Sequence, residues 1–195
     1  MTDSSLNLSN HRERLLAGLA DVLEHKSFHQ ITLADIAAAA RVSRRTFYEH
    51  FHSKDECLLA LCEDTGQHVM RVIQAAGEAG QPWVEQVRVT TAAYLSVFQA
   101  RPLLMRALYL ELAALGPTGM AMRRRVAEQF AAFLQAQIER QRARGEHLQP
   151  LSLPMGVAIV AGINELILYS LSTDPSGDLR SLSQDAEQLI LRASA

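Results

Sequence analysis

Residues 31–61 read ITLADIAAAARVSRRTFYEHFHSKDECLLAL and carry two helix starts separated by a short turn. The first apolar residues, up to Ala40, recur at the spacing of one helical face, and Thr32 just before Leu33 is a favourable N-cap residue. Asp35 lies three residues after Thr32, where its carboxylate can complete a capping box. The pattern predicts a short helix that begins at Leu33.

A second helix is predicted after Ser43, which is another N-cap residue. Its inner side carries Phe47 and Phe51, four residues apart, while Arg44 and Arg45 lie in its first turn. Over residues 41–54, four basic residues stand against a single acidic one. DNA binding depends on the local field more than on net charge, so this segment has the charge pattern of a DNA contact.

The segment resembles the DNA-binding domain of the tetracycline-repressor (TetR) family. A bare helix-turn-helix pattern is a weak signal, but here the match continues into Ser53 and Glu56 at the start of the next helix. Residues 10–26 look like the family's first helix, with Asn10 as its N-cap. The residues that carry the resemblance are Thr32, Ile36, Ala37, Ala40, Val42, Ser43, Thr46, Phe47, Tyr48, Phe51, Ser53, Lys54, Glu56 and Leu58.

The resemblance implies that the helix after Ser43 enters the major groove of double-stranded operator DNA. Two positions depart from the family pattern. Arg41 replaces the usual glycine of the turn, which predicts a non-glycine residue at positive φ. Arg45 replaces a small residue, which favours contacts to guanine. The expected DNA-binding residues are Thr32, Arg41, Ser43, Arg44, Arg45, Thr46, Tyr48, His50 and Lys54.

The rest of the chain has helical periodicity and no alternating strand pattern, so the predicted fold class is all-α with about nine helices. We expect a helix-turn-helix DNA-binding domain at residues 1–53 and a helical effector-binding and dimerisation domain at residues 54–195. The further helices are predicted at residues 54–77, 83–99, 102–115, 120–144, 155–172 and 178–192, with turns at 80–82, 116–119 and 173–177.

Residues 151–171 form the longest apolar run, about long enough to cross a membrane. Pro154 shortens the helix, and Asn164 and Glu165 would lie inside the bilayer, so the run favours a protein interface. A two-fold dimer would present two recognition helices to half-sites about 34–36 Å apart in a near-palindromic operator. The expected dimer interface consists of Gly156, Ile159, Ala161, Ile163, Leu166, Ile167, Leu182, Leu189 and Ile190.

Large apolar residues gather in the middle helices and could line a cavity for a small apolar effector. Each of them taken alone is more typical of a helical core. Glu111 and Asn164, polar groups on otherwise apolar helices, could orient such an effector. The candidate pocket residues are Trp83, Tyr94, Phe98, Met105, Tyr109, Met122, Phe130 and Phe133.

The 195 residues are 48% hydrophobic and 21% charged, with a formal net charge of −2, as in an ordinary soluble globular protein. The polar N-terminus lacks a signal-peptide pattern, and Cys57 and Cys62 are five apart on one predicted helix, so we expect a reducing cytoplasm. No catalytic constellation or cofactor motif is found, and the histidines lack the spacing of metal ligands. We therefore expect no enzyme activity, no cofactor and no metal.

Together these patterns predict a ligand-responsive transcriptional regulator that acts as a homodimer, with repression as the simplest mode. One alternative is a regulator without a small-molecule effector, controlled by a partner protein. Another is a helical ligand-binding protein whose DNA-binding head is vestigial.

Overall fold

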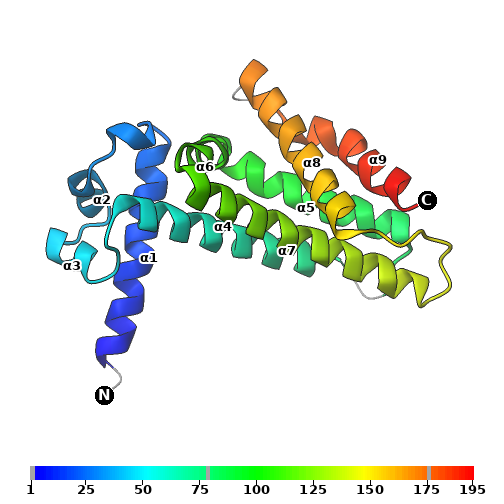
Figure 1. The fold of residues 1–195 in the computed structure, drawn as a ribbon, viewed down its shortest axis with the longest axis horizontal. Coiled ribbons are helices and arrows are strands. Elements are labelled where there is room, and N and C mark those ends of the chain that lie inside the picture. Colours follow the sequence, from blue (N-terminus) through cyan, green and yellow to red (C-terminus); the bar gives the residue numbers. More distant parts are fainter. Residues whose placement is uncertain (1–2, 78–79, 175–176) are drawn as a thin grey trace. The chain divides into compact units, whose positions relative to one another are not determined.

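A computed structural model of the chain describes residues 3–77, 80–174 and 177–195 (Figure 1). All regular structure in these ranges is helical, which confirms the all-α prediction. The elements are α1 (Asp3–Leu23), η1 (Phe28–Gln30), α2 (Leu33–Ala39), α3 (Arg44–Tyr48), α4 (Lys54–Ala76), α5 (Trp83–Ala100), α6 (Pro102–Ala114), α7 (Gly116–Arg142), α8 (Leu153–Thr173), η2 (Leu179–Leu182) and α9 (Ser183–Ala193).

Two predicted helix boundaries are wrong. Helix α1 begins at Asp3, so Asn10 lies inside the helix and does not cap it. Helix α7 begins at Gly116, and the predicted turn at residues 116–119 is its first turn. Pro117 fits there because the first-turn N–H groups of a helix have no partner within it. Gly116 makes the corner with a φ of 61°.

The C-terminal segment also differs from its prediction. The helix expected over residues 178–192 is divided into η2 and α9. Asp178 caps η2 by accepting a hydrogen bond from the backbone N–H of Arg180 at 3.0 Å. Of the turn predicted at residues 173–177, positions 175 and 176 lie outside the described residues.

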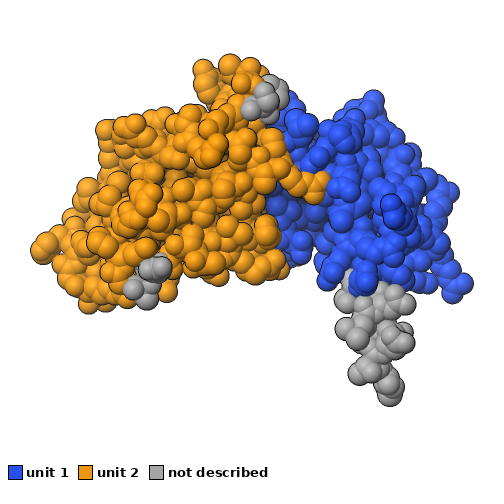
Figure 2. Space-filling view, turned by 180° about the vertical axis from the view of Figure 1, so that it is seen from behind, with its two compact units in different colours: residues 1–65, 103–122 blue, residues 66–102, 123–195 orange. Residues whose placement is uncertain are grey.

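Contacts divide the chain into two compact units (Figure 2). Unit 1 comprises Met1–Thr65 and Leu103–Met122. Its core joins Leu15, Phe47 and Leu58 to Leu104 and Leu108 of α6, so that packing in this unit extends well past residue 53. The division into a DNA-binding domain at residues 1–53 and an effector-binding and dimerisation domain at residues 54–195 concerns function, and it stays a prediction.

Unit 2 comprises Gly66–Pro102 and Arg123–Ala195. Its core includes Leu95 of α5, Ile138 of α7 and Ile167 of α8, all almost fully buried. Trp83, at the start of α5, donates from Nε1 to Oγ of Ser194 at 3.0 Å, which ties α5 to the end of the chain. This unit is a helical bundle closed by α9.

Helix α8 is the one helix in the described ranges that is long and apolar enough, by length and composition alone, to cross a membrane. Only 28% of its most apolar 18-residue window is buried within the chain. A helix at the centre of a monomer's core would be buried to a greater extent, so α8 offers apolar surface beyond what its own chain covers.

Candidate nucleic-acid interface

Helix α3 rests on two phenylalanine rings and exposes its cationic side. Phe47 is fully buried and Phe51 nearly so, with ring centroids 5.8 Å apart. On the other side Arg44 and Arg45 are exposed, and Tyr48 is 55% exposed. Aromatic packing therefore fixes the rotation of this short helix and directs its guanidinium groups to solvent.

The first turn of α3 is capped as the sequence predicts. Ser43 Oγ accepts a hydrogen bond from the backbone N–H of Thr46 at 3.0 Å, and the two hydroxyls lie 2.9 Å apart. Arg45 forms an i,i+4 pair with Glu49 at 3.3 Å, although the Arg45 side chain is 90% exposed. Such an exposed pair contributes little stability, so a phosphate or base can replace Glu49 at small cost.

The turn between α2 and α3 has the strained residue that the sequence predicts, since Arg41 has a φ of 54°. Sequence reasoning missed what holds it: Arg14 of α1 donates from Nη2 to the carbonyl oxygen of Arg41 at 2.7 Å. The N–H of Val42 also donates to the carbonyl of Ala37 at 2.9 Å. The side chain of Arg41, three residues before the start of α3, is exposed to solvent.

The packing of α1 on α2 depends on a glycine. A Cβ on Gly18 would lie 2.8 Å from the backbone nitrogen of Ala40 and 3.1 Å from its Cβ. No real Cβ approaches backbone so closely, so only glycine allows the two helices to cross here. This crossing places the end of α2, and with it the turn into α3.

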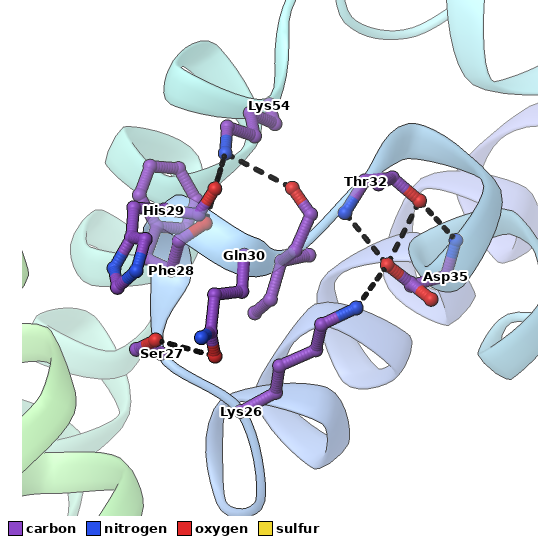
Figure 3. A network of polar contacts seen from close by, with 9 residues as sticks. Lys26, Ser27, Phe28, His29, Gln30, Thr32, Asp35 and Lys54 are labelled. Atoms are coloured by element: carbon purple, nitrogen blue, oxygen red, sulfur yellow. Dashed lines mark hydrogen bonds and ion pairs between the residues drawn. The ribbon is translucent and has the colours of Figure 1, made fainter.

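The segment between α1 and α2 is held by a polar network (Figure 3). Asp35 Oδ2 accepts hydrogen bonds from the backbone N–H of Thr32 at 2.7 Å, from the Thr32 hydroxyl at 2.8 Å and from Lys26 Nζ at 2.8 Å. The Lys26 ammonium first, and then the Thr32 N–H and hydroxyl, hold the pKa of Asp35 well below its usual range. The predicted capping box of α2 is confirmed.

Lys54 also belongs to this network, where the sequence had suggested a phosphate contact. Its Nζ donates to the carbonyl oxygens of Phe28 at 2.8 Å and Ile31 at 2.9 Å, and lies 3.4 Å from that of His29 (Figure 3). It also lies 4.6 Å from the centroid of the Phe28 ring. This ammonium therefore ties α4 to the η1 turn and has few donors left for DNA.

Glu111 of α6 binds the same turn within unit 1. Its Oε1 accepts a hydrogen bond from the backbone N–H of Phe28 at 3.2 Å. The sequence had offered Glu111 as a group that could orient an effector; in the structure its carboxylate instead contacts the DNA-binding head. Lys54 and Glu111 thus hold opposite polar ends of one residue, Phe28.

His50 turns toward α1. Its ring makes an edge contact with that of His11, with centroids 6.3 Å apart, and its buried Nε2 has no hydrogen-bond partner among the described residues. Burial first, and then the nearby His11 and Arg12, lower the pKa of His50 against the opposing effect of Glu49. The burial of Nε2 and the lowered pKa both reduce the attraction of His50 to a phosphate.

The nine expected DNA-binding residues thus differ in accessibility. Six are exposed: Thr32, Arg41, Ser43, Arg44, Arg45 and Tyr48. Thr46, His50 and Lys54 are half-buried, and each has a local structural contact. Helix α3 exposes its N-terminal arginines next to α2, which fits a helix-turn-helix, whose second helix presents its N-terminal residues to base edges.

Residues 15–61 match the sequence model described as "Bacterial regulatory proteins, tetR family". The N-terminal domain of this chain is that of the TetR family. A comparison with curated proteins finds no match. Among solved structures, the chain is similar to fatty acid degradation regulator FadR from Bacillus halodurans, with 19% identity, 93% of this chain and 94% of that chain covered, and a TM-score of 0.81.

Two further structures show the same fold. The transcriptional regulator FadR from Bacillus subtilis, in complex with stearoyl-CoA, has 19% identity, coverage of 93% of this chain and 98% of that chain, and a TM-score of 0.78. A putative tetR family transcription regulator from Shewanella sp. PV-4 has 22% identity, coverage of 95% and 98%, and a TM-score of 0.72. Residues 15–61 therefore match the TetR family's N-terminal region, and the chain as a whole shares the fold of these solved regulators.

Unit 2 contains a small apolar cavity. It has a volume of about 70 Å³, and its aromatic lining consists of Tyr94, Phe130 and Phe133. Phe98 stacks on Tyr94 with centroids 4.8 Å apart but does not line the cavity, and Trp83 is a core residue. The remaining candidates, Met105, Tyr109 and Met122, belong to unit 1.

The residues expected at the dimer interface also fall into two groups. Five of them, Gly156, Ile159, Ile163, Ile167 and Ile190, are buried within the chain itself. Ala161 and Leu189 are exposed, and Leu166 and Leu182 are half-buried. A broad groove of about 870 Å³ follows the outer side of α8 and α9 and is lined by Met155, Ala158, Ile159, Gly162, Glu165, Leu166, Tyr169, Asp185, Gln188, Leu189, Arg192 and Ala193.

Proposed function

We propose that this TetR-family protein is a cytoplasmic transcriptional repressor that binds a near-palindromic operator as a homodimer and is released by a small-molecule effector. The observation that carries the proposal is α3, whose exposed Arg44 and Arg45 stand on the buried Phe47. Arginine pairs bidentately with guanine in the major groove, and Tyr48 beside them is free to contact bases or backbone.

The homodimer is supported by the outer side of α8 and α9. Tyr169 is 72% exposed, Met155 51% and Leu189 39%, and all three line one groove. Gly162 and Ala158 lie between them and permit close approach of another helix. A second copy, related by a two-fold axis, would cover this apolar surface and pair two DNA-binding heads.

An effector is supported by the small cavity of unit 2 and by the similarity to the Bacillus subtilis regulator in complex with stearoyl-CoA. Effector binding would favour a conformation whose heads no longer match the operator. Linkage limits this effect to the differential affinity of the effector for the two conformations, about 1–3 kcal/mol.

The test is selection of bound duplexes from random DNA with the full chain at a stated salt concentration. We expect an inverted repeat, bound by two chains. The double variant Arg44→Ala/Arg45→Ala should lose this preference, and the charge-matched control Arg124→Ala/Arg142→Ala, with both changes in unit 2, should keep it. A monomer in solution, or unchanged binding by the α3 variant, would contradict the proposal.

A further inference from the structure

Unit 2 contains a second cavity beside the apolar one. It has a volume of about 370 Å³, within the usual range of small-molecule sites. Ile73, Thr90 and Phe133 line both cavities, so these three side chains form the wall between them. The rest of its lining is mostly polar: Gln74, Gly77, Gln86, Gln137, Arg140, Gln141 and Arg144.

Three glutamines hold the polar cavity in shape. Gln141 Nε2 donates to Gln86 Oε1 at 2.6 Å and to the carbonyl of Gln81 at 2.9 Å. Gln86 Nε2 in turn donates to Gln137 Oε1. Because Gln86 and Gln141 are buried and their amide nitrogens both have acceptors within this network, the network preorganises α5 against α7.

The charge of the polar cavity is positive. Arg140 and Arg144 line it, and within the described part of the chain no carboxylate lies within ion-pair distance of either guanidinium. Arg142, between them in the sequence, differs on both counts: it pairs with Glu139 at 2.9 Å and does not line the cavity. Arg140 Nε donates to the carbonyl oxygen of Ala136 at 3.2 Å, so this guanidinium keeps its charge without a carboxylate partner. The C-terminal end of a helix carries about −0.5 elementary charge, which the two positive charges of Arg140 and Arg144 exceed.

Three polar side chains line the apolar cavity, Thr90, Thr91 and Tyr94, and the hydroxyls of Thr90 and Tyr94 donate to the carbonyl oxygen of Gln86 and to Asn164 Oδ1. Thr91 is only 4% exposed, and its Oγ1 has no hydrogen-bond partner among the residues that the structure describes. The other lining side chains include Phe130, Leu134 and Ile163. With a volume of about 70 Å³, this cavity is suited to the end of a hydrocarbon chain, and it leaves the Thr91 hydroxyl unsatisfied.

We propose that the two cavities together bind an amphipathic anion. Its carboxylate or phosphate lies at Arg140 and Arg144, and its alkyl chain passes Thr90 and Phe133 into the apolar cavity. The proposal rests on the proposed effector response and specifies its chemistry: a purely apolar effector would leave the cationic cavity unused. A free fatty acid and an acyl thioester with a phosphate-bearing carrier share this chemistry.

The first experiment is calorimetric titration of the full chain, without DNA, with octanoate, octanoyl-CoA, octanol and coenzyme A. We expect octanoate or octanoyl-CoA to bind, and octanol, which lacks the anion, to bind at least tenfold more weakly. The tighter of the two anionic probes identifies the source. Equal binding of octanol, or binding of neither anionic probe, would overturn the proposal.

The second experiment places the anion and the chain with variants. Arg140→Gln/Arg144→Gln should raise the Kd of the bound anionic probe about tenfold, while the matched control Arg142→Gln should leave it unchanged. Thr91→Val, which removes a hydroxyl that an alkyl chain cannot satisfy, should tighten binding of the same probe. Equal weakening by Arg142→Gln, or a Kd unaffected by the double variant, would contradict this placement.

Operator binding is measured separately on each variant without any probe. Failure of the wild type to bind an inverted repeat would count against the proposed function alone, because the titrations do not use DNA. Loss of ligand binding in Arg140→Gln/Arg144→Gln with operator binding intact would support both. Thermal unfolding of each variant confirms that the exposed substitutions leave the chain folded.

Discussion

Replacing Lys54 with Met separates a structural role from a DNA contact. The ammonium donates to two carbonyl oxygens at 2.8 and 2.9 Å and lies over the Phe28 ring, while methionine keeps only the apolar stem. A hydrogen bond to a charged group contributes about 1.5–3 kcal/mol. Because Lys54 is half-buried and water can reach the freed carbonyls in part, we expect a total loss of about 2 kcal/mol in the free energy of unfolding.

For a chain of this size such a loss corresponds to a Tm lower by about 4–8 °C in thermal unfolding. Operator affinity is then measured against salt concentration, well below the Tm. A phosphate contact contributes about 0.9 to the slope of log K against log salt. We expect the slope to stay unchanged in Lys54→Met and to fall in Arg44→Ala, whose exposed side chain should alter Tm little. A Lys54 variant with unchanged Tm and a slope lower by about one would refute the reasoning.

Three further substitutions test the head by chemical denaturation, and a fourth, Gly66→Ala in unit 2, serves as a control. Gly18→Ala should destabilise the fold by about 1–3 kcal/mol, because its Cβ would lie 2.8 Å from the backbone of Ala40. In Gly66→Ala the new Cβ would have only ordinary contacts, from 3.5 Å, so this variant should be more stable by up to about 1 kcal/mol. Arg41→Gly should stabilise by about 1 kcal/mol by relieving a φ of 54°, and a loss of stability would show that φ is not strained. The lowered pKa of Asp35 means that its ionised form stabilises the folded state. The wild type should therefore be more stable than Asp35→Asn at pH 7, and this difference should decline below about pH 4. A difference that stays constant with pH would contradict the capping network.

The local structure of the head could be predicted from the sequence because its causes are local. Thr32 and Ser43 cap helices that begin one residue later, and each cap depends on partners within three residues. The positive φ of Arg41 follows likewise from the turn that separates two adjacent helices. The rotation of α3 follows from the burial of Phe47, whereas the prediction that Phe51 lies on the same helix is wrong, because α3 ends at Tyr48 and Phe51 packs against Phe47 from the segment after it.

The roles of charged residues could not be predicted in the same way. The sequence shows that Lys54 is at a helix N-terminus, where a cation is unfavourable and a phosphate would be one explanation. The structure supplies another, since the carbonyls of Phe28 and Ile31 approach from a segment more than twenty residues away. Nothing in the local pattern distinguishes a lysine that binds such carbonyls from one that binds DNA.

The same limit applied to the apolar surfaces. Helical periodicity correctly identified the apolar residues of α8. It could not show which of them pack in the chain's own core and which face a partner. In the structure Ile163 and Ile167 are buried within the chain, Met155 and Tyr169 are exposed in the groove along α8 and α9, and Ile159 is buried at the edge of that groove. The division depends on which side α9 covers, and α9 approaches from a turn whose geometry the sequence does not specify.

The packing of α6 in unit 1 is explained by the burial of apolar surface. A small three-helix head buries a smaller fraction of its surface than a larger domain and gains stability from added apolar contacts. Leu104 and Leu108 supply such contacts from α6, and Glu111 adds a hydrogen bond to Phe28. Any shift of α6 that breaks these contacts alters the support of η1, and η1 leads directly into the capping box of α2. The head is thus sensitive to α6 through the packing that makes it stable.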